Sequence, residues 1–203
     1  MKTAKHTFLS ILFLFTSIHL IAQYQPKNLT KADLKKAEEW VNTTYNSLSQ
    51  DQKLGQLFIV ALYTNKGENY ISNVRSIVEQ EQIGGLILMQ DDAAREINLV
   101  NEFQSKSKVP LMIGMDAEWG LFQRIAAAHK FPWAMTLGAI QDKNLITQMA
   151  AKIAEDSKRM GINWDFAPVV DVNTNPDNPI IGNRSFGSEV QNVVNSALAY
   201  SSG

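Results

Sequence analysis

Charged and aromatic side chains gather after one short apolar run, residues 111–115. Asp116 follows this run directly, and Trp119 and Arg124 come within the next eight residues. A carboxylate accepts hydrogen bonds from two vicinal hydroxyl groups, and a guanidinium group donates several in a fixed geometry. Trp119 adds an apolar ring face. These residues suit the binding of a sugar ring, but a structural Asp–Arg ion pair with Trp119 in the core fits them equally well.

A second polar group follows a later apolar run, residues 164–172. Arg184 lies in a loop bounded by two glycines, which gives it freedom to reach a ligand, although a solvated loop charge is the alternative. We expect Asp171 to hold backbone amides of its loop. Glu118 is expected to orient its neighbours, and His129 to be structural. The candidate binding residues are therefore Asp116, Arg124 and Arg184, and no catalytic residue is assigned.

The composition excludes several classes of function. The chain has 203 residues with a formal net charge of −1, so it lacks the basic excess expected of a nucleic-acid-binding protein. It has no cysteine and only three histidines, which excludes disulfides, a cysteine nucleophile, thiolate metal sites and a multi-histidine metal site. Gly84-Gly85 precedes an apolar run rather than following one, so it is not a nucleotide loop. We expect neither a cofactor nor a metal.

The N-terminus has the pattern of a secretory signal peptide over residues 1–22. Two lysines precede a mostly apolar stretch that ends at Ala22. This stretch is short for a membrane span, which needs ~20 predominantly apolar residues, so an uncleaved anchor is the less favoured alternative. The expected product is an exported protein, periplasmic or secreted, with no stable membrane span after cleavage. Residues 23–48 form a lead and a helix, and residues 49–203 form the main domain.

Apolar runs alternate with amphipathic stretches along the main domain. Strands are expected at 57–63, 83–89, 111–115, 135–139 and 164–172, with helices between them and a last helix near 190–197. Runs that are apolar on both faces and alternate with helices predict a parallel sheet covered by helices. A (β/α)8 barrel and an open doubly wound sheet both fit. Four or five βα units are fewer than a barrel needs, so we expect a TIM-like barrel cut short after them.

Two capping boxes are expected near the start of the chain. Thr30 with Asp33 opens the first helix, and Ser49 with Gln52 opens a short second one. In the first helix Val41 and Tyr45 belong to a set of apolar residues at helical spacing, which predicts one buried face.

Several short segments together resemble the N-terminal domain of glycoside hydrolase family 3, and especially its exported β-N-acetylglucosaminidases (β-N-acetylhexosaminidases). The segments occur in the order expected for that family and cover the chain from about Ser49 to its end. They are residues 53–57 (KLGQL), 83–88 (IGGLIL), 115–118 (MDAE) with Gln123-Arg124, 135–139 (MTLGA), 161–163 (GIN) with 166–172 (FAPVVDV), and 183–187 (NRSFG).

The resemblance implies a TIM-like barrel and a retaining glycoside hydrolase. Asp116, Arg124 and Arg184 are then expected to contact the sugar in the cleavage subsite. The implied substrate is terminal β-linked N-acetylglucosamine, as in peptidoglycan fragments. The family's aspartate nucleophile and its histidine acid/base are both expected beyond Gly203. Expressed alone, the chain is therefore expected to be inactive and poorly folded, because an open half-barrel exposes a strand edge.

Two other functions stay open from the sequence. A non-catalytic exported carbohydrate-binding module could use the same three binding residues. An inverting hydrolase could use Asp116 and Asp171 as its acid/base pair, which requires a separation of ~6.5–9.5 Å. The sequence leaves undecided the glycan, the choice of water or phosphate as acceptor, any downstream domain and the oligomeric state.

Overall fold

The computed structural model describes residues 30–203. The chain forms two compact units, and the boundary between them in the sequence falls between Asn46 and Ser47. The expected signal peptide and most of the lead lie outside the described residues. The elements follow in the order α2 (Lys31–Ser47), α3 (Gln50–Gly55), β1 (Ile59–Leu62), α4 (Glu68–Ser76), the π-helical turn η1 (Ile77–Glu81), β2 (Gly85–Leu88), α5 (Ala93–Lys106), β3 (Met112–Met115), the 3-10 turn η2 (Leu121–Gln123), α6 (Ala134–Gly138), α7 (Lys143–Arg159), β4 (Trp164–Asp165), the 3-10 turn η3 (Gly182–Arg184) and α8 (Val190–Ser202).

Both expected capping boxes form. Thr30 donates its backbone N–H to Asp33 Oδ2 at 3.0 Å, and the Asp33 N–H donates to Thr30 Oγ1 at 3.2 Å. Ser49 and Gln52 make the same reciprocal pair at the start of α3. The predicted buried face of α2 is wrong, because none of its residues is buried and Val41 is 53% exposed. The helix begins at its cap and is stabilised by local hydrogen bonds rather than by burial of its own side chains.

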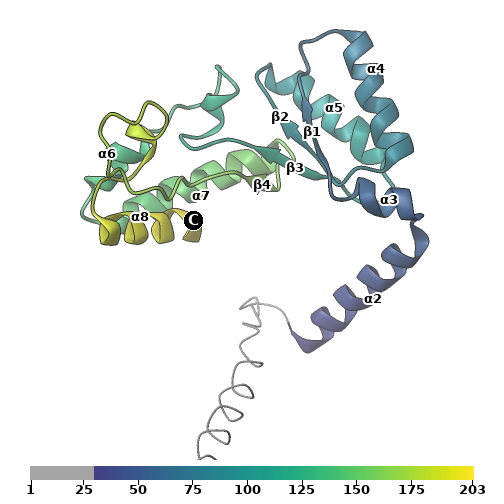
Figure 1. The fold of residues 1–203 in the computed structure, drawn as a ribbon, viewed down its shortest axis with the longest axis horizontal. Helices are drawn as coiled ribbons and strands as arrows, with labels where there is room; N and C mark the ends of the chain where they lie inside the picture. Colours follow the sequence, from purple (N-terminus) through teal and green to yellow (C-terminus); the bar gives the residue numbers. More distant parts are fainter. Residues whose placement is uncertain (1–29) are drawn as a thin grey trace, which may run out of the picture. The chain divides into compact units, whose positions relative to one another are not determined.

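The main unit is built on a four-stranded parallel sheet in the order β1-β2-β3-β4 (Figure 1). Each strand pairs with the next strand in the chain, so the described sheet has no reversal of the kind that defines a doubly wound fold. The alternating parallel strands and helices confirm the predicted α/β class. The sequential order is the one that successive βα units of a barrel produce.

The two faces of this sheet differ in burial. Leu62, Leu88 and Ile113 are fully buried in a core that includes residues of α4, α5 and α7. On the other face Met112 and Trp164 are each exposed by about two fifths, at 43% and 42%. The helices therefore cover one face of the sheet, and the opposite face carries apolar side chains that remain accessible.

Gly114 makes room on the accessible face of β3. A Cβ atom at this position would lie 2.6 Å from Phe166 Cε2, so no larger residue fits without moving the ring. Phe166 follows β4 and its ring lies 4.9 Å from that of Trp164, measured between centroids. The glycine thus allows the chain leaving β4 to fold back against β3.

Two predicted strands differ in the structure. Residues 135–139 were expected to form a strand, but residues 135–138 belong to helix α6. In this helix the Leu137 N–H donates to the Trp133 carbonyl at 3.1 Å, and the side chains of Ala134 and Leu137 are buried. The strand expected at 164–172 pairs with β3 only at Trp164 and Asp165. Pro168 has no N–H to donate to a ladder, which limits this strand.

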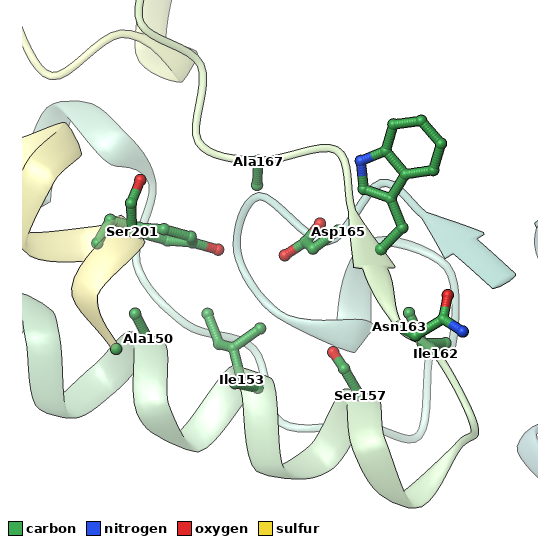
Figure 2. A pocket seen from close by; sticks show the side chains of 12 residues that line it. Ala150, Ile153, Ser157, Ile162, Asn163, Asp165, Ala167 and Ser201 are labelled. Atoms are coloured by element: carbon green, nitrogen blue, oxygen red, sulfur yellow. The ribbon is translucent and has the colours of Figure 1, made fainter. Parts of the chain in front are cut away.

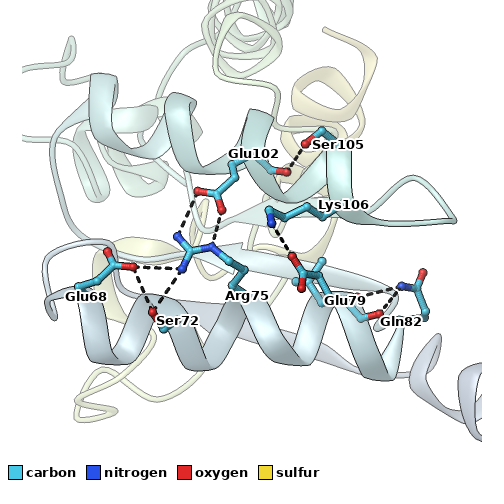
Figure 3. Close-up of polar contacts among 9 residues, drawn as sticks. Glu68, Ser72, Arg75, Glu79, Gln82, Glu102, Ser105 and Lys106 are labelled. Atoms are coloured by element: carbon cyan, nitrogen blue, oxygen red, sulfur yellow. Dashed lines mark hydrogen bonds and ion pairs between the residues drawn. The ribbon is translucent and has the colours of Figure 1, made fainter.

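The outer helices are joined by ion pairs (Figure 3). Arg75 of α4 bonds Glu102 of α5 through both Nε and Nη2, and its Nη1 lies 3.1 Å from Glu68 Oε1. Lys106 at the end of α5 pairs with Glu79 of η1, which follows α4. Gln82 ends the π-helical turn: its Nε2 donates to the Glu79 carbonyl at 2.9 Å, and its Oε1 accepts from the Lys108 N–H at 2.8 Å.

Candidate functional site

The candidate site is built on residues 116–124, called here the β3 loop, which leaves the carboxyl end of β3. Ligands of parallel α/β folds bind at this end of the strands. Asp116 comes directly after β3, and its Oδ2 accepts a hydrogen bond from Arg124 Nη2. The Asp116 side chain is 32% exposed and that of Arg124 is 14% exposed. Because no described residue bonds Asp116 Oδ1, this oxygen is free to accept from a ligand.

A second ion pair, between Glu118 and Arg184, lies beside the first. Glu118 is 8% exposed, and both its oxygens accept from Arg184 Nε, at 3.1 and 3.0 Å. Arg184 Nη2 lies 2.9 Å from Glu118 Oε1. The hydrogen bond to Glu118 raises the pKa of Arg184, and Asp116 and Asp171 add to the effect. Arg184 is therefore anchored to the β3 loop rather than free in solvent, and 34% of its side chain stays exposed.

The β3 loop owes its shape to a glycine and a glutamine. Gly120 has a φ of 82°, and a Cβ atom there would lie 2.7 Å from Phe131 Cδ2. Both constraints restrict the position to glycine. Gln123 Oε1 accepts the Glu118 N–H at 2.8 Å, which ties the end of η2 back to the carboxylate that holds Arg184.

The aromatic side chains of the loop are already partnered. Trp119 stacks on Trp133 with 4.1 Å between ring centroids, so one face of its ring is covered and the predicted stacking platform is at most one-sided. His129 is exposed and meets Phe131 edge-on at 4.6 Å. This contact agrees with a structural place for the histidine.

Asp171 does not have its expected role of holding backbone amides of its loop. Among the described hydrogen bonds, its backbone carbonyl accepts from Ser185 Oγ at 2.6 Å, and no backbone amide donates to its carboxylate. The Asp171 side chain is exposed, whereas neighbouring Asn173 has a buried Oδ1 without a partner in the described structure. Arg124 Nε is also buried and unpartnered there. Buried polar atoms without partners are rare, so the one on Arg124, which bonds Asp116, marks the surroundings of Asp116 as a place for further polar contacts.

A cavity of about 320 Å³ lies behind the β3 loop, between α7, β4 and the end of α8 (Figure 2). Figure 2 shows Asp165 pointing into it above Ile153 and Ser157 of α7. Burial, together with a smaller effect of the nearby Asp116 and Glu118, raises the pKa of Asp165 to about 6. Its Oδ1 accepts the Ala117 N–H at 3.0 Å.

The described residues contain no cluster of three or more side chains able to hold a metal ion. Within the same part of the chain, no helix is both long enough and apolar enough to cross a membrane.

Comparison with known proteins decides the family of this chain. Residues 49–203 match the glycosyl hydrolase family 3 N-terminal domain. The chain belongs to glycosyl hydrolase family 3. The predicted relationship to β-N-acetylglucosaminidases is confirmed: the β-N-acetylglucosaminidase/β-glucosidase of Cellulomonas fimi is 34% identical over 161 residues, covering 79% of this chain and 28% of that protein.

Two solved structures share the family 3 fold with this chain. A β-glucoside phosphorylase bound to 2FGlc superposes with a TM-score of 0.78 at 27% identity, covering 88% of this chain and 31% of the other. A family 3 β-N-acetylglucosaminidase from Paenibacillus sp. FPU-7 gives a TM-score of 0.64 at 29% identity, covering 75% and 30%. The chain spans less than a third of the length of each of these three relatives.

The candidate site thus gathers all three residues predicted to bind substrate, Asp116, Arg124 and Arg184, at one end of the sheet. Their contact with a sugar stays a prediction. Sequence reasoning missed Asp165 and Tyr200, which approach the β3 loop from β4 and α8. The one available indication was that Asp165 lies in the strand expected at 164–172, between two of the matching segments.

Proposed function

We propose that this chain supplies the sugar-binding part of a glycosidase that removes terminal β-linked N-acetylglucosamine or a related β-sugar. The observation that carries the proposal is the presence of two adjacent ion pairs, Asp116–Arg124 and Glu118–Arg184, at the carboxyl end of β3 in a family 3 chain. Four sequential strands with helices on one face fit a segment of a (β/α)8 barrel whose interior is the accessible face.

Asp116 is the first binding group of this proposal. Its Oδ1 accepts a hydrogen bond from a ring hydroxyl while Oδ2 stays on Arg124, which prevents the carboxylate from rotating. The exposed part of Arg184 donates to a neighbouring oxygen of the sugar while its Nε stays on Glu118. Two oriented and opposite charges can thus bind neighbouring hydroxyl groups on one edge of the ring.

The bond-breaking groups of the proposed reaction lie outside the described site. Retaining glycosidases use a nucleophile and an acid/base, canonically two carboxyl groups ~5–5.5 Å apart. We propose that a later aspartate and a histidine loop, encoded after codon 203, supply them. Sequencing the coding DNA past that codon tests this proposal. An open frame with a Lys-His-x-x-Gly loop and a later Asp supports it, and a stop codon after Gly203 leaves a carbohydrate-binding module as the function.

Substrate binding is tested on the complete gene product with p-nitrophenyl β-N-acetylglucosaminide and the matching β-glucoside. Loss of one hydrogen bond to a charged group costs ~1.5–3 kcal/mol, so Asp116→Ala should lower kcat/KM by about 10- to 100-fold. Asp51→Asn is the matched control, because Asp51 lies in α3 before the amino end of β1. Equal activity of the Asp116 variant and the wild type overturns the assignment, and saturable binding without turnover favours the binding module.

Phosphate as an alternative acceptor is favoured by one specific observation, the similarity to a β-glucoside phosphorylase. The same assay run with and without inorganic phosphate separates the two reactions. A sugar 1-phosphate product identifies a phosphorylase, and free sugar in the presence of phosphate identifies a hydrolase.

We also propose that the protein is exported and acts on amino-sugar glycans of the cell wall. This proposal rests on the signal-peptide pattern of residues 1–22. Cell fractionation with N-terminal sequencing tests it. A mature protein that begins near Gln23 outside the cytoplasm is expected, and an intact N-terminus in the cytoplasm contradicts it.

A further inference from the structure

Ala117 separates the two carboxylates of the candidate site and is itself fully buried. A buried backbone N–H or C=O needs a hydrogen-bond partner. The Ala117 N–H bonds a side chain, and the Ala117 carbonyl accepts both the backbone N–H of Gly120 at 2.8 Å and a side-chain hydroxyl. The two side chains come from elements far away in the chain.

Asp165 and Tyr200 provide these two contacts. Asp165, the last residue of β4, accepts the Ala117 N–H on Oδ1 at 3.0 Å. Tyr200 of α8 donates its hydroxyl to the Ala117 carbonyl at 3.3 Å. The next amide, that of Glu118, is held by Gln123. Three side chains thus contact three consecutive polar groups of the backbone between Asp116 and Glu118, and the Gly120 N–H shares the Ala117 carbonyl with Tyr200.

The direction of Asp116 and Glu118 follows from this arrangement. Their side chains leave the backbone on either side of Ala117, so rotation of either Ala117 peptide plane displaces both carboxylates and the arginines bound to them. The loop carries a 3-10 turn and an isolated bridge at Glu118 and Gly120, but among the described contacts the Ala117 N–H is held by a side chain alone.

We infer that Asp165 and Tyr200 are positioning residues for sugar binding: they hold the Ala117 peptide groups and thereby aim Asp116 and Glu118 at the substrate. This inference rests on the proposed function. Asp165 touches neither substrate nor reacting atoms in this arrangement, and it acts through the backbone of the β3 loop.

Stability alone does not account for an acidic residue at position 165. The Asp165 carboxyl lies in a cavity lined by Ile153, Ile162 and Ala167, beside two other carboxylates, and burial of its charge is unfavourable. The raised pKa of this group, about 6, has that burial as its main cause. An apolar side chain would fill the cavity better, but it would leave the Ala117 N–H without an acceptor.

Four variants of the complete gene product test the inference. Asp165→Ala removes the acceptor, Asp165→Asn keeps an acceptor oxygen without the charge, and Tyr200→Phe removes only the hydroxyl. Ser157→Ala is the control, because its hydroxyl lines the same cavity and is buried without a partner among the described residues. For each variant we would measure KM and kcat on the β-N-acetylglucosaminide, the melting temperature, and amide hydrogen exchange at Ala117.

The expected results separate positioning from simple structural support. Loss of folded protein lowers apparent kcat and leaves KM unchanged, whereas a displaced Asp116 raises KM. A displacement of ~1 Å can cost about 100-fold in rate, so Asp165→Ala should lower kcat/KM by about that factor, mainly through KM. Its Ala117 amide should exchange at least about tenfold faster, as expected for a lost hydrogen bond of ~1.4 kcal/mol. Asp165→Asn should restore both properties to within about threefold, because Asn still offers an acceptor oxygen. Tyr200→Phe should have a smaller effect, and the control none.

Failure of the inference and failure of the proposed function are distinct outcomes. If the wild type cleaves neither sugar, the proposed function fails, and Ala117 exchange still shows whether Asp165 holds the loop. If the wild type is active but Asp165→Ala keeps the wild-type KM and exchange rate, the inference is overturned. Equal damage from Asp165→Asn and Asp165→Ala also overturns it, because the acceptor oxygen would then not be the important group.

Discussion

The ion pairs that join α4 to α5 and the polar contacts of the β3 loop serve different purposes. Between the two helices, Arg75 forms ion pairs with Glu68 and Glu102, and these side chains are between 25% and 73% exposed. In the loop, Glu118 is 8% exposed and Ala117 is fully buried. Both regions contain charge-assisted hydrogen bonds, but only in the loop is the carboxylate of such a bond, that of Glu118, shielded from water.

The difference shows where polar bonds determine structure. The helices α4 and α5 already pack through apolar residues such as Val74, Val100 and Phe103, each of which is at most 3% exposed. Exposed ion pairs in proteins typically contribute less than about 1 kcal/mol. In the β3 loop the carboxylate of Glu118 and the peptide groups of Ala117 are buried, and a buried group left without its partner costs about 1–3 kcal/mol. The loop should therefore be far more sensitive to loss of a polar partner.

Glu118→Gln should have the largest effect on stability. The substitution removes the charge that Arg184 binds through three contacts, and Arg184 cannot lose its own charge. We expect the free energy of unfolding to fall by about 2 kcal/mol, less than for a fully buried pair because Arg184 is partly exposed. Urea denaturation of wild type and variant measures the difference. An unchanged midpoint would show that the pair is dispensable.

Glu96 of α5 extends the comparison to a buried carboxyl on an outer helix. It is fully buried, both its oxygens lack partners among the described residues, and burial raises its pKa to about 8, with Asp91 and Asp92 adding to the effect. Below about pH 4.5 the group is protonated in both folded and unfolded chains. As the pH rises from there to 8, only the unfolded chain releases the proton, so the folded state loses stability.

Glu96→Gln should remove this pH dependence. Relative to wild type, the variant should gain stability on the order of 2 kcal/mol between pH 5 and pH 8, because a neutral amide has no proton to release. Urea denaturation at both pH values measures the gain. Identical pH profiles for the two proteins would refute a buried neutral carboxyl. Glu102→Gln, on the exposed side of the same helix, is the matched control.

Glu102→Gln should itself have the smallest effect. It breaks the ion pair with Arg75, but Glu68 remains to bond the guanidinium, and solvent reaches all three side chains. The melting temperature should shift by less than about 2 °C. Differential scanning calorimetry checks the shift, and a decrease as large as that of Glu118→Gln would remove the distinction between the two regions.

Much of the fold could be predicted from the sequence. The three apolar runs at 57–63, 83–89 and 111–115 contain β1, β2 and β3, because continuous apolar runs bounded by turn residues are typical of buried parallel strands. The helices α5 and α7 follow equally well from apolar spacing. The errors fall where that spacing is uninformative: residues 134–138 are too few to show a period, and Pro168 interrupts the run at 164–172.

The candidate site was predictable only in part. Asp116, Arg124 and Arg184 carry charges at strand ends or in a glycine-bounded loop, which marks them as polar groups of one edge. Their pairing was only partly foreseen, because Glu118 binds Arg184 from 66 residues away. Asp165 and Tyr200 were missed because they reach Ala117 across 48 and 83 residues, and no local pattern records such contacts.

The sequential order of the strands has a consequence for the nascent chain. Ile59 pairs with Gly85 and Gly85 pairs with Met112, so partners in the first two ladders are 26 and 27 residues apart, whereas Gly114 and Trp164 in the third are 50 apart. During synthesis, β1, β2 and β3 can join soon after each leaves the ribosome. The β3 loop must wait for β4 and then for α8. We therefore expect the groups of the candidate site to assemble last, on a sheet that has already formed.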